Sequence, residues 1–194
     1  MASLLKNIFV SRVRIKLLEV LLSKPGELFY VRQLVRATSE EINAVRRELA
    51  NLQGAGMIIR ENRANRVYYY FNKKNVLYEE LLSMINKTTG LGKLFLKQRQ
   101  KLGKIKAVYF SLAFAEKQPY SEEAVDVVII GDVVLPEISA LIGTEQIKLD
   151  REINYTVLDI EEYTYRKTKR DPFVLTLLTM PRVMIIGSQF DLFN

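Results

Sequence analysis

Residues 38–71 constrain the fold of this chain more than any other stretch, because they carry the clearest helix signal and two strand-like runs directly after it. Thr38, followed three residues later by Glu41, is typical of a capping box, in which each side chain accepts a hydrogen bond from the other residue's backbone N–H. We therefore expect a helix to begin at Thr38. Apolar residues then recur at helical spacing and predict one buried face: Ile42, Val45, Leu49 and Leu52.

Two short strands are expected after this helix. Gly54 ends the helix, and strand-like runs follow at residues 57–60 and 67–71. The loop that joins the two runs holds Arg63 and Arg66. A helix followed by a hairpin with a basic tip is the outline of a winged helix-turn-helix.

The segment before Thr38 supplies the other helices of such a motif. Ser11 is typical of an N-cap for a helix that runs to Ser23, and residues 29–36 predict a second, short helix. Two short helices joined by a tight turn form a helix-turn-helix. Before Ser11, a short amphipathic segment is expected from Leu4, Leu5, Ile8 and Phe9.

Second helices of this motif place their first turns against base edges in the major groove of DNA. Arg47 can donate to guanine, Asn43 can bond adenine, and Ala44 can meet a thymine methyl group. The candidate base-contacting residues are Glu40, Asn43, Ala44 and Arg47. The candidate contacts to the DNA backbone or minor groove are Arg32, Arg46, Arg63 and Arg66. The alternative is that these are solvated side chains of a winged helix used for protein contacts.

The charge is distributed unevenly along the chain, which suggests two domains with different partners. The basic excess suits double-stranded DNA, but it equally fits cations that only solvate helix surfaces. Residues 1–106 hold 21 Lys and Arg against 8 Asp and Glu, a net charge of +13, whereas residues 107–194 hold 8 against 14, a net charge of −6. A basic half is suited to a polyanion. The chain has no cysteine and no histidine, which removes the commonest metal ligands and the commonest general base.

Three regions are predicted. Residues 1–75 form a winged helix-turn-helix DNA-binding domain, residues 76–104 a helical connector, and residues 105–194 a further domain. Helices are expected in the connector at 77–87 and 92–102, and they can pair with a second copy. Because winged helices commonly read symmetric sites, we expect a homodimer.

The C-terminal region predicts an α/β domain with a mixed sheet, which makes the whole chain α+β. Strand-like runs are separated by helical patterns, as expected when strands and helices alternate. The expected strands are 107–114, 124–131, 152–158 and 182–187, and the expected helices are 135–142, 160–169 and 171–179.

The order of these elements and several sequence words resemble minimal nucleotidyltransferases of the DNA-polymerase-beta superfamily, in the group that carries an N-terminal winged helix. The words are SRVRIKLLEVLL, INAVRRELANLQGAGMI, GKIKAVYFSLAF, VDVVIIGD and LDREINYTVLDIEEY. The resemblance implies a Gly-Ser turn that holds nucleotide phosphates, two aspartates one residue apart that bind a divalent metal, and a third carboxylate on a later strand.

This sequence departs from the family at the residues that carry the chemistry. Ser111 and Asp126 keep the serine and one aspartate of the degenerate nucleotidyltransferase site. The positions that have changed are occupied by Phe110, Phe114, Ala115, Ala124 and Asn154. One acid out of three is too few to hold a catalytic metal, since metal-assisted phosphoryl transfer needs several oxygen ligands. We therefore expect no metal, no cofactor and no enzymatic activity.

Taken together, the sequence predicts a cytoplasmic transcriptional regulator with a degenerate nucleotidyltransferase-like domain, which supports assembly or senses a nucleotide or protein ligand. Charges interrupt the apolar N-terminus too often for a membrane span, so no membrane association is expected. Two alternatives remain open: an active nucleotidyltransferase that modifies a protein or small molecule, and an antitoxin-like protein-interaction module.

Overall fold

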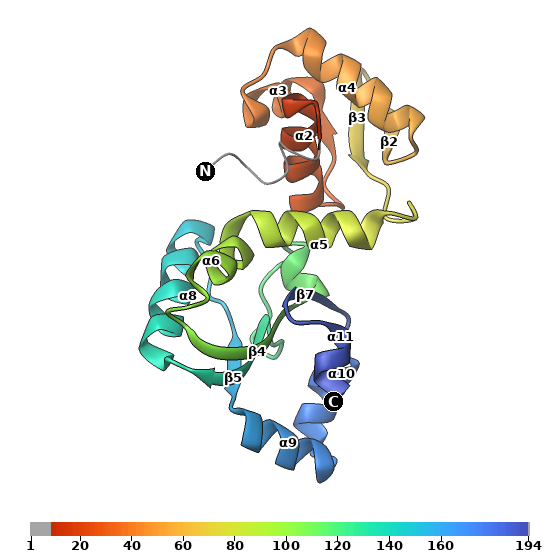
Figure 1. The fold of residues 1–194 in the computed structure, drawn as a ribbon. Coiled ribbons are helices and arrows are strands. Elements are labelled where there is room, and N and C mark those ends of the chain that lie inside the picture. The colour runs from red at the N-terminus through yellow and green to blue at the C-terminus, as the bar shows by residue number, and fades with distance from the viewer. Residues whose placement is uncertain (1–8, 194) are drawn as a thin grey trace. The chain divides into compact units, whose positions relative to one another are not determined.

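The computed structural model describes residues 9–193 and has an α+β architecture (Figure 1). The chain divides into two compact units, the first unit (Met1–Thr88) and the second unit (Thr89–Asn194). The segment expected to connect two domains, residues 76–104, is therefore shared between the units. Apart from Phe9, the amphipathic segment expected at residues 4–9 lies outside the described residues.

Helices of the first unit pack around a small antiparallel sheet. The helices are α2 (Arg12–Ser23), α3 (Val31–Thr38), α4 (Ile42–Gly54) and α5 (Tyr78–Thr88). The strands are β1 (Phe29–Tyr30), β2 (Ile58–Arg63) and β3 (Arg66–Phe71), in the order β1-β3-β2. α2, α3 and α4 pack against one another, and α5 packs on α2. The fully buried side chains at their centre include Leu17, Leu21, Leu34, Val45, Leu49 and Phe71.

The predicted N-cap of α4 is wrong by three residues. The carboxylate of Glu41, not the hydroxyl of Thr38, caps α4, because it accepts a hydrogen bond from the backbone N–H of Ala44 at 2.9 Å. Thr38 is instead the last residue of α3, and its hydroxyl donates to the carbonyl of Leu34 at 2.7 Å. Ser39 then takes a left-handed conformation with φ of 53°, which ends α3 and redirects the chain into α4.

Local pairing in the sheet corrects two further expectations. Residues 29–36 were expected to be helical throughout, but Phe29 and Tyr30 pair with β3 as a short strand, so the helix begins only at Val31. Arg63 and Arg66 were expected in a loop, but they face each other as the last pair of the β2–β3 ladder. The hairpin turn is therefore only two residues long, and Ala64 within it has a positive φ of 48°.

A four-stranded mixed sheet forms the centre of the second unit. Its strands are β4 (Gly103–Ser111), β5 (Val127–Val133), β6 (Tyr155–Leu158) and β7 (Arg182–Ile186), in the order β6-β5-β4-β7. β5 and β6 are parallel and the other pairs are antiparallel. The helices are α6 (Gly90–Gln98), α7 (Leu112–Ala115), α8 (Leu135–Leu149), α9 (Ile160–Thr168), α10 (Pro172–Thr179) and α11 (Gln189–Phe193).

Helices cover both faces of this sheet (Figure 1). α6 and α8 pack together on one side, and α9, α10 and α11 lie on the other. A buried hydrophobic cluster joins the strands to the second group of helices, through Tyr109 and Val128 on the sheet and Tyr163, Val174 and Leu177 on the helices. Two buried tyrosine hydroxyls are satisfied there, since Tyr109 donates to the carbonyl of Leu177 at 3.0 Å and Tyr163 donates to that of Leu192 at 2.5 Å. No helix among residues 9–193 is long and apolar enough to cross a membrane.

Candidate nucleic-acid interface

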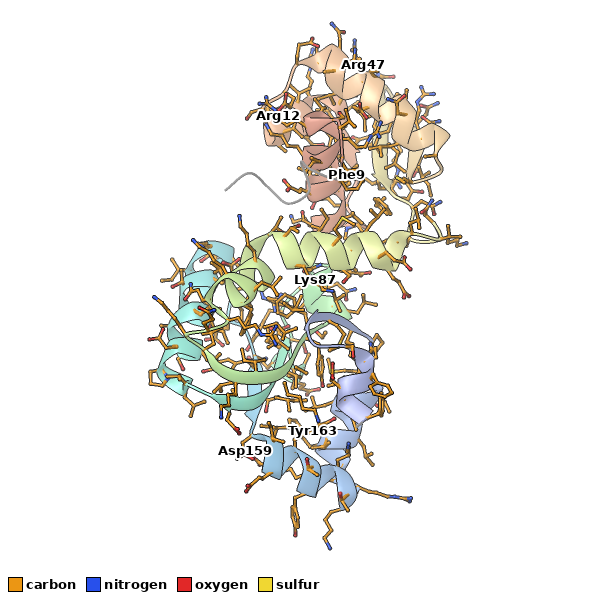
Figure 2. All side chains as sticks on the ribbon, in the orientation of Figure 1. Phe9, Arg12, Arg47, Lys87, Asp159 and Tyr163 are labelled. Carbon is orange, nitrogen blue, oxygen red and sulfur yellow. The ribbon has the colours of Figure 1, made fainter. Side chains whose placement is uncertain are left out.

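The outer face of α4 carries polar and basic side chains. Asn43, Arg46 and Arg47 are exposed, and Ala44 is half-buried beside them. Figure 2 labels Arg47 on α4. The opposite face buries Val45, Leu49 and Leu52 against the rest of the first unit. Amphipathic packing thus fixes which side of α4 meets solvent, and Asn43, Ala44 and Arg47 lie together on or beside that side, as the sequence predicts.

Glu40 occupies a different position from the other predicted base-contacting residues. It precedes α4, and its side chain is only 10% exposed. One of its oxygens lies 2.6 Å from Nζ of Lys16 and 2.8 Å from Nη2 of Arg12, both on α2. These hydrogen bonds, first the one from Lys16, hold the pKa of the Glu40 carboxyl below its usual value. Glu40 is engaged in tying the turn before α4 to α2.

A second ion pair fixes α4 against α2. Nε of Arg14 donates to the carboxylate of Glu48 at 2.9 Å, and the Glu48 side chain is only 8% exposed. Burial acts to raise the pKa of Glu48, but hydrogen bonds from Ser11 and Arg14 outweigh it, so the pKa lies below the usual value. This pair was not anticipated, because nothing in the sequence marks which carboxylate of a helix turns inward.

α3 contributes a further pair of cations. Arg32, a predicted backbone contact, is exposed on the first turn of α3. Arg36 follows at the i+4 position, is also exposed, and donates to the hydroxyl of Tyr30 at 3.3 Å. Residues four apart share a helix face, so the spacing from Arg32 was a sufficient signal for Arg36, which was not among the predicted contacts.

The hairpin presents more arginines, although one is partly neutralised. Arg60, Arg63 and Arg66 are exposed on β2 and β3. Nε of Arg63 lies 2.7 Å from the carboxylate of Glu61. This hydrogen bond raises the pKa of Arg63 above its usual value. The guanidinium of Arg66 lies over the ring of Tyr30, 5.1 Å from the ring centroid, and is not paired with any carboxylate of residues 9–193.

In the second unit, the two residues predicted to remain of a nucleotidyltransferase site, Ser111 and Asp126, lie side by side. The backbone N–H of Ser111 donates to the carbonyl of Asp126 at 2.8 Å. The Ser111 hydroxyl caps α7 by accepting a hydrogen bond from the N–H of Phe114 at 3.2 Å. The hydroxyl therefore has a structural role. Both residues are buried, with exposures of 6% for Ser111 and 5% for Asp126.

Arg151 occupies the space in front of Asp126. Its Nη2 lies 2.7 Å from Oδ2 of Asp126, and Nη1 donates to the carbonyl of Gln118 at 3.0 Å. The guanidinium also lies over the rings of Phe114 and Tyr120, at 5.3 and 5.5 Å. Asp126 accepts a second hydrogen bond from the N–H of Asn154 at 3.1 Å. The carboxylate is therefore engaged by protein donors.

Asn154, which stands where the resemblance implies a third carboxylate, has a structural role of its own. Nδ2 of Asn154 donates to the carbonyls of Ser121, Glu122 and Ala124, which makes Asn154 a brace for the loop before β5. Among residues 9–193, no group of three or more acidic side chains is placed to hold a metal ion. The role of Arg151 was not predicted, because only the fold brings it next to Asp126.

Comparison of the chain with protein-family models, with curated proteins and with solved structures finds no match.

Proposed function

We propose that the first unit is a winged helix-turn-helix that binds double-stranded DNA, with α4 in the major groove, and that the protein is a transcriptional regulator. The observation that carries the proposal is the arrangement of charge around α4. Glu40, Glu41 and Glu48 are each turned to an internal partner: cations of α2, the α4 N-terminus and Arg14, respectively. The cations of α4, Arg46 and Arg47, are exposed and form no ion pair with another described residue.

This arrangement suits a polyanion for a simple physical reason. Acidic side chains on the outer face of a groove-reading helix repel phosphate. Here Glu40 and Glu48 are largely buried and paired with cations of α2, and the exposed Glu41 accepts a hydrogen bond at the α4 N-terminus. The exposed side chains that remain are hydrogen-bond donors of the kinds that read guanine and adenine, Arg47 and Asn43. Ala44 between them supplies a small apolar contact for a thymine methyl group.

The hairpin that follows α4 carries further exposed cations. Arg60, Arg63 and Arg66 supply contacts to the backbone or minor groove, as the second part of a winged helix does. Arg32 and Arg36 on α3 supply further backbone contacts. Base reading thus rests on Asn43, Ala44 and Arg47, and the arginines of α3 and the hairpin give position and affinity.

The second unit is, in this proposal, a nucleotidyltransferase-like domain without activity. The support is local: Ser111 caps a helix, Asp126 is held by Arg151 and Asn154, and the space in front of Asp126 is filled by a guanidinium. The unit instead supports a homodimer on a symmetric DNA site. Exposed apolar side chains favour such an assembly role, among them Phe173, Leu175, Phe190 and Phe193.

The proposal is tested by titrating a fluorescent random-sequence duplex with the full chain at several salt concentrations. Binding is expected to weaken steeply with salt, because each neutralised phosphate releases a counterion. A matched single-stranded oligonucleotide is the control and is expected to bind less tightly. The absence of salt-dependent duplex binding would contradict the proposal.

A further inference from the structure

The second unit has a neutral overall composition, but its charges are segregated. It contains 14 Lys and Arg and 14 Asp and Glu. Residues 89–106 hold six of the cations and no acid, while residues 107–194 hold eight cations against 14 acids. The basic excess is therefore confined to α6, the turn after it and the first residues of β4, and the winged-helix proposal does not use it.

Four of these cations are exposed on α6 or directly after it, and we call them the α6 patch: Lys93, Lys97, Arg99 and Lys101. Lys93 and Lys97 are one helical turn apart on α6, so their side chains emerge about 6 Å apart on one face. Lys101 follows in a tight turn closed by a hydrogen bond from its N–H to the carbonyl of Gln98 at 2.8 Å. The patch thus continues past the end of the helix.

Two residues of the patch, Lys97 and Lys101, line a hollow of suitable chemistry for phosphate. The hollow measures about 360 Å³ and is lined by Lys97, Gln98, Gln100 and Lys101. Two ammonium groups and two amides offer several donors, and no carboxylate is present in the lining. A phosphate group approaching it meets only groups that can neutralise it or donate to it.

Repulsion among the cations of the α6 patch destabilises the isolated protein. Like charges at i and i+4 destabilise a helix by a few tenths of a kcal/mol. Within the described part of the chain, no ion pair engages the four side chains, and the nearby acid of α8, Glu145, is buried and paired with Lys148 at 3.3 Å. A polyanionic partner would remove this repulsion.

A duplex fits these features better than an anionic membrane does. A helix that lies on a membrane needs a broad apolar face turned outward. α6 instead buries Leu91 and Phe95 inside the second unit, and leaves Leu96 as its exposed large apolar side chain. A charged surface with little exposed apolar area is typical of contacts to a phosphate backbone.

We propose that the α6 patch is a second DNA-contacting surface, which binds backbone phosphates without reading sequence and adds to the affinity of the first unit. The inference rests on the proposed function in that the polyanion is the same duplex. It predicts that two separate sets of residues control two separate properties. Asn43 and Arg47 control the choice of sequence, and the α6 patch controls sequence-independent affinity and its salt dependence.

The test compares the full chain with the double variant Lys97→Gln/Lys101→Gln on a random-sequence duplex. The slope of log K against log salt is expected to become shallower by about 2, since each phosphate that the protein no longer neutralises reduces it by about 0.9. The matched control is Lys167→Gln/Lys169→Gln, which removes the same charge from exposed or half-buried positions at the end of α9 and is expected to leave the slope unchanged. Circular dichroism of each variant checks that the fold is retained.

Failure of this inference is distinguishable from failure of the proposed function. An unchanged slope in Lys97→Gln/Lys101→Gln, with normal duplex binding by the original chain, overturns the inference alone. A shallower slope in a protein that prefers no sequence supports the inference and contradicts the regulator. Loss of binding to phosphatidylserine vesicles with an unchanged duplex slope would assign the patch to a membrane surface and overturn the inference. An original chain that binds no duplex overturns both.

Discussion

The guanidinium of Arg151 lies 2.7 Å from the carboxylate of Asp126, and both side chains are largely shielded from solvent, with exposures of 18% and 7%. The pair joins the start of β5 to the segment before β6. Arg151 also donates through Nε to the carbonyl of Glu152 at 3.0 Å and through Nη1 to that of Gln118 at 3.0 Å. Asp126 thus belongs to a structural network. We expect substitution of Asp126 to lower the stability of the second unit rather than to remove a catalytic activity.

Removing both partners of this pair should destabilise the second unit by less than the sum of the two single removals. Arg151→Met leaves the Asp126 carboxylate without its cation, and breaking a buried pair in this way costs about 3 to 5 kcal/mol. Asp126→Asn/Arg151→Met is expected to cost less than the sum of the single variants. Urea unfolding of the four proteins in a double-mutant cycle measures the difference. Additive losses would contradict the network.

No nucleotidyl transfer is expected from the chain. Incubation with labelled nucleoside triphosphates and Mg²⁺ or Mn²⁺ should give no incorporation into protein or small molecules, because Asp126 is held by Arg151 and Asn154 rather than open to a metal. The control is Asp126→Ala under the same conditions. Incorporation by the original chain that disappears in Asp126→Ala would overturn the proposal of an inactive domain.

Stability of the first unit should fall in acid, and Glu48 should account for part of the fall. The folded-state pKa of Glu48 lies below its ordinary value of 4.5, so its stabilising contribution is complete above about pH 4.5 and is lost as the pH falls through the folded-state pKa. Glu48→Gln should therefore unfold more easily at neutral pH and depend less on pH below about pH 4.5. Chemical unfolding across this range provides the measurement, with Glu79→Gln on α5 as an exposed control.

That expectation fails if Glu48→Gln and the original chain lose stability in parallel as the pH falls.

Charge at the hairpin should tune affinity for all duplexes equally. Arg66→Ala removes a cation that no carboxylate of the described residues neutralises, so binding to every duplex should weaken and the salt slope should fall by about 1. Glu61→Gln removes the carboxylate paired with Arg63 at 2.7 Å and should strengthen binding to every duplex. Titrations with a selected site and with random duplex test both. Opposite effects on the two duplexes would show that the hairpin reads sequence.

Much of the fold was predictable because periodicity and caps are local signals. Ser11, Asp159 and Asp171 cap α2, α9 and α10 as side-chain acceptors, and the sequence indicated a helix beginning near each of them. The parts that differ depend on tertiary contacts. Thr38 matches a capping box by pattern, yet its hydroxyl donates a hydrogen bond to the preceding turn of α3. Phe29 matches a helical pattern, yet it pairs with β3 as part of a strand.

Gly131 is a strand residue whose role also depends on a tertiary contact. Its position predicts the end of β5, but the strand continues to Val133. Gly131 has φ of 146° and passes so close to Lys104 that a Cβ would collide with the carbonyl oxygen. The glycine therefore allows two strands to approach, a role that only the pairing partner reveals.

The candidate site was predictable where it depends on one helix and unpredictable where it depends on contacts between elements. Asn43, Ala44 and Arg47 follow from the spacing of the buried face of α4. Glu40 matched the same spacing, but its position before α4 and its partners on α2 remove it from our proposed base contacts. The contact of Arg151 with Asp126 depends on the fold and has no signal in the sequence.

We propose above all that α4 reads DNA sequence through Asn43 and Arg47. The most direct measurement is selection of bound duplexes from a random pool by the full chain, followed by titration of the selected and random duplexes with Asn43→Ala/Arg47→Ala. We predict an enriched, two-fold symmetric sequence, and a variant that loses about 2 to 6 kcal/mol of binding to it, about 1 to 3 for each base contact, while random-duplex binding changes far less. Equal losses on both duplexes, or no enriched sequence, would contradict the account.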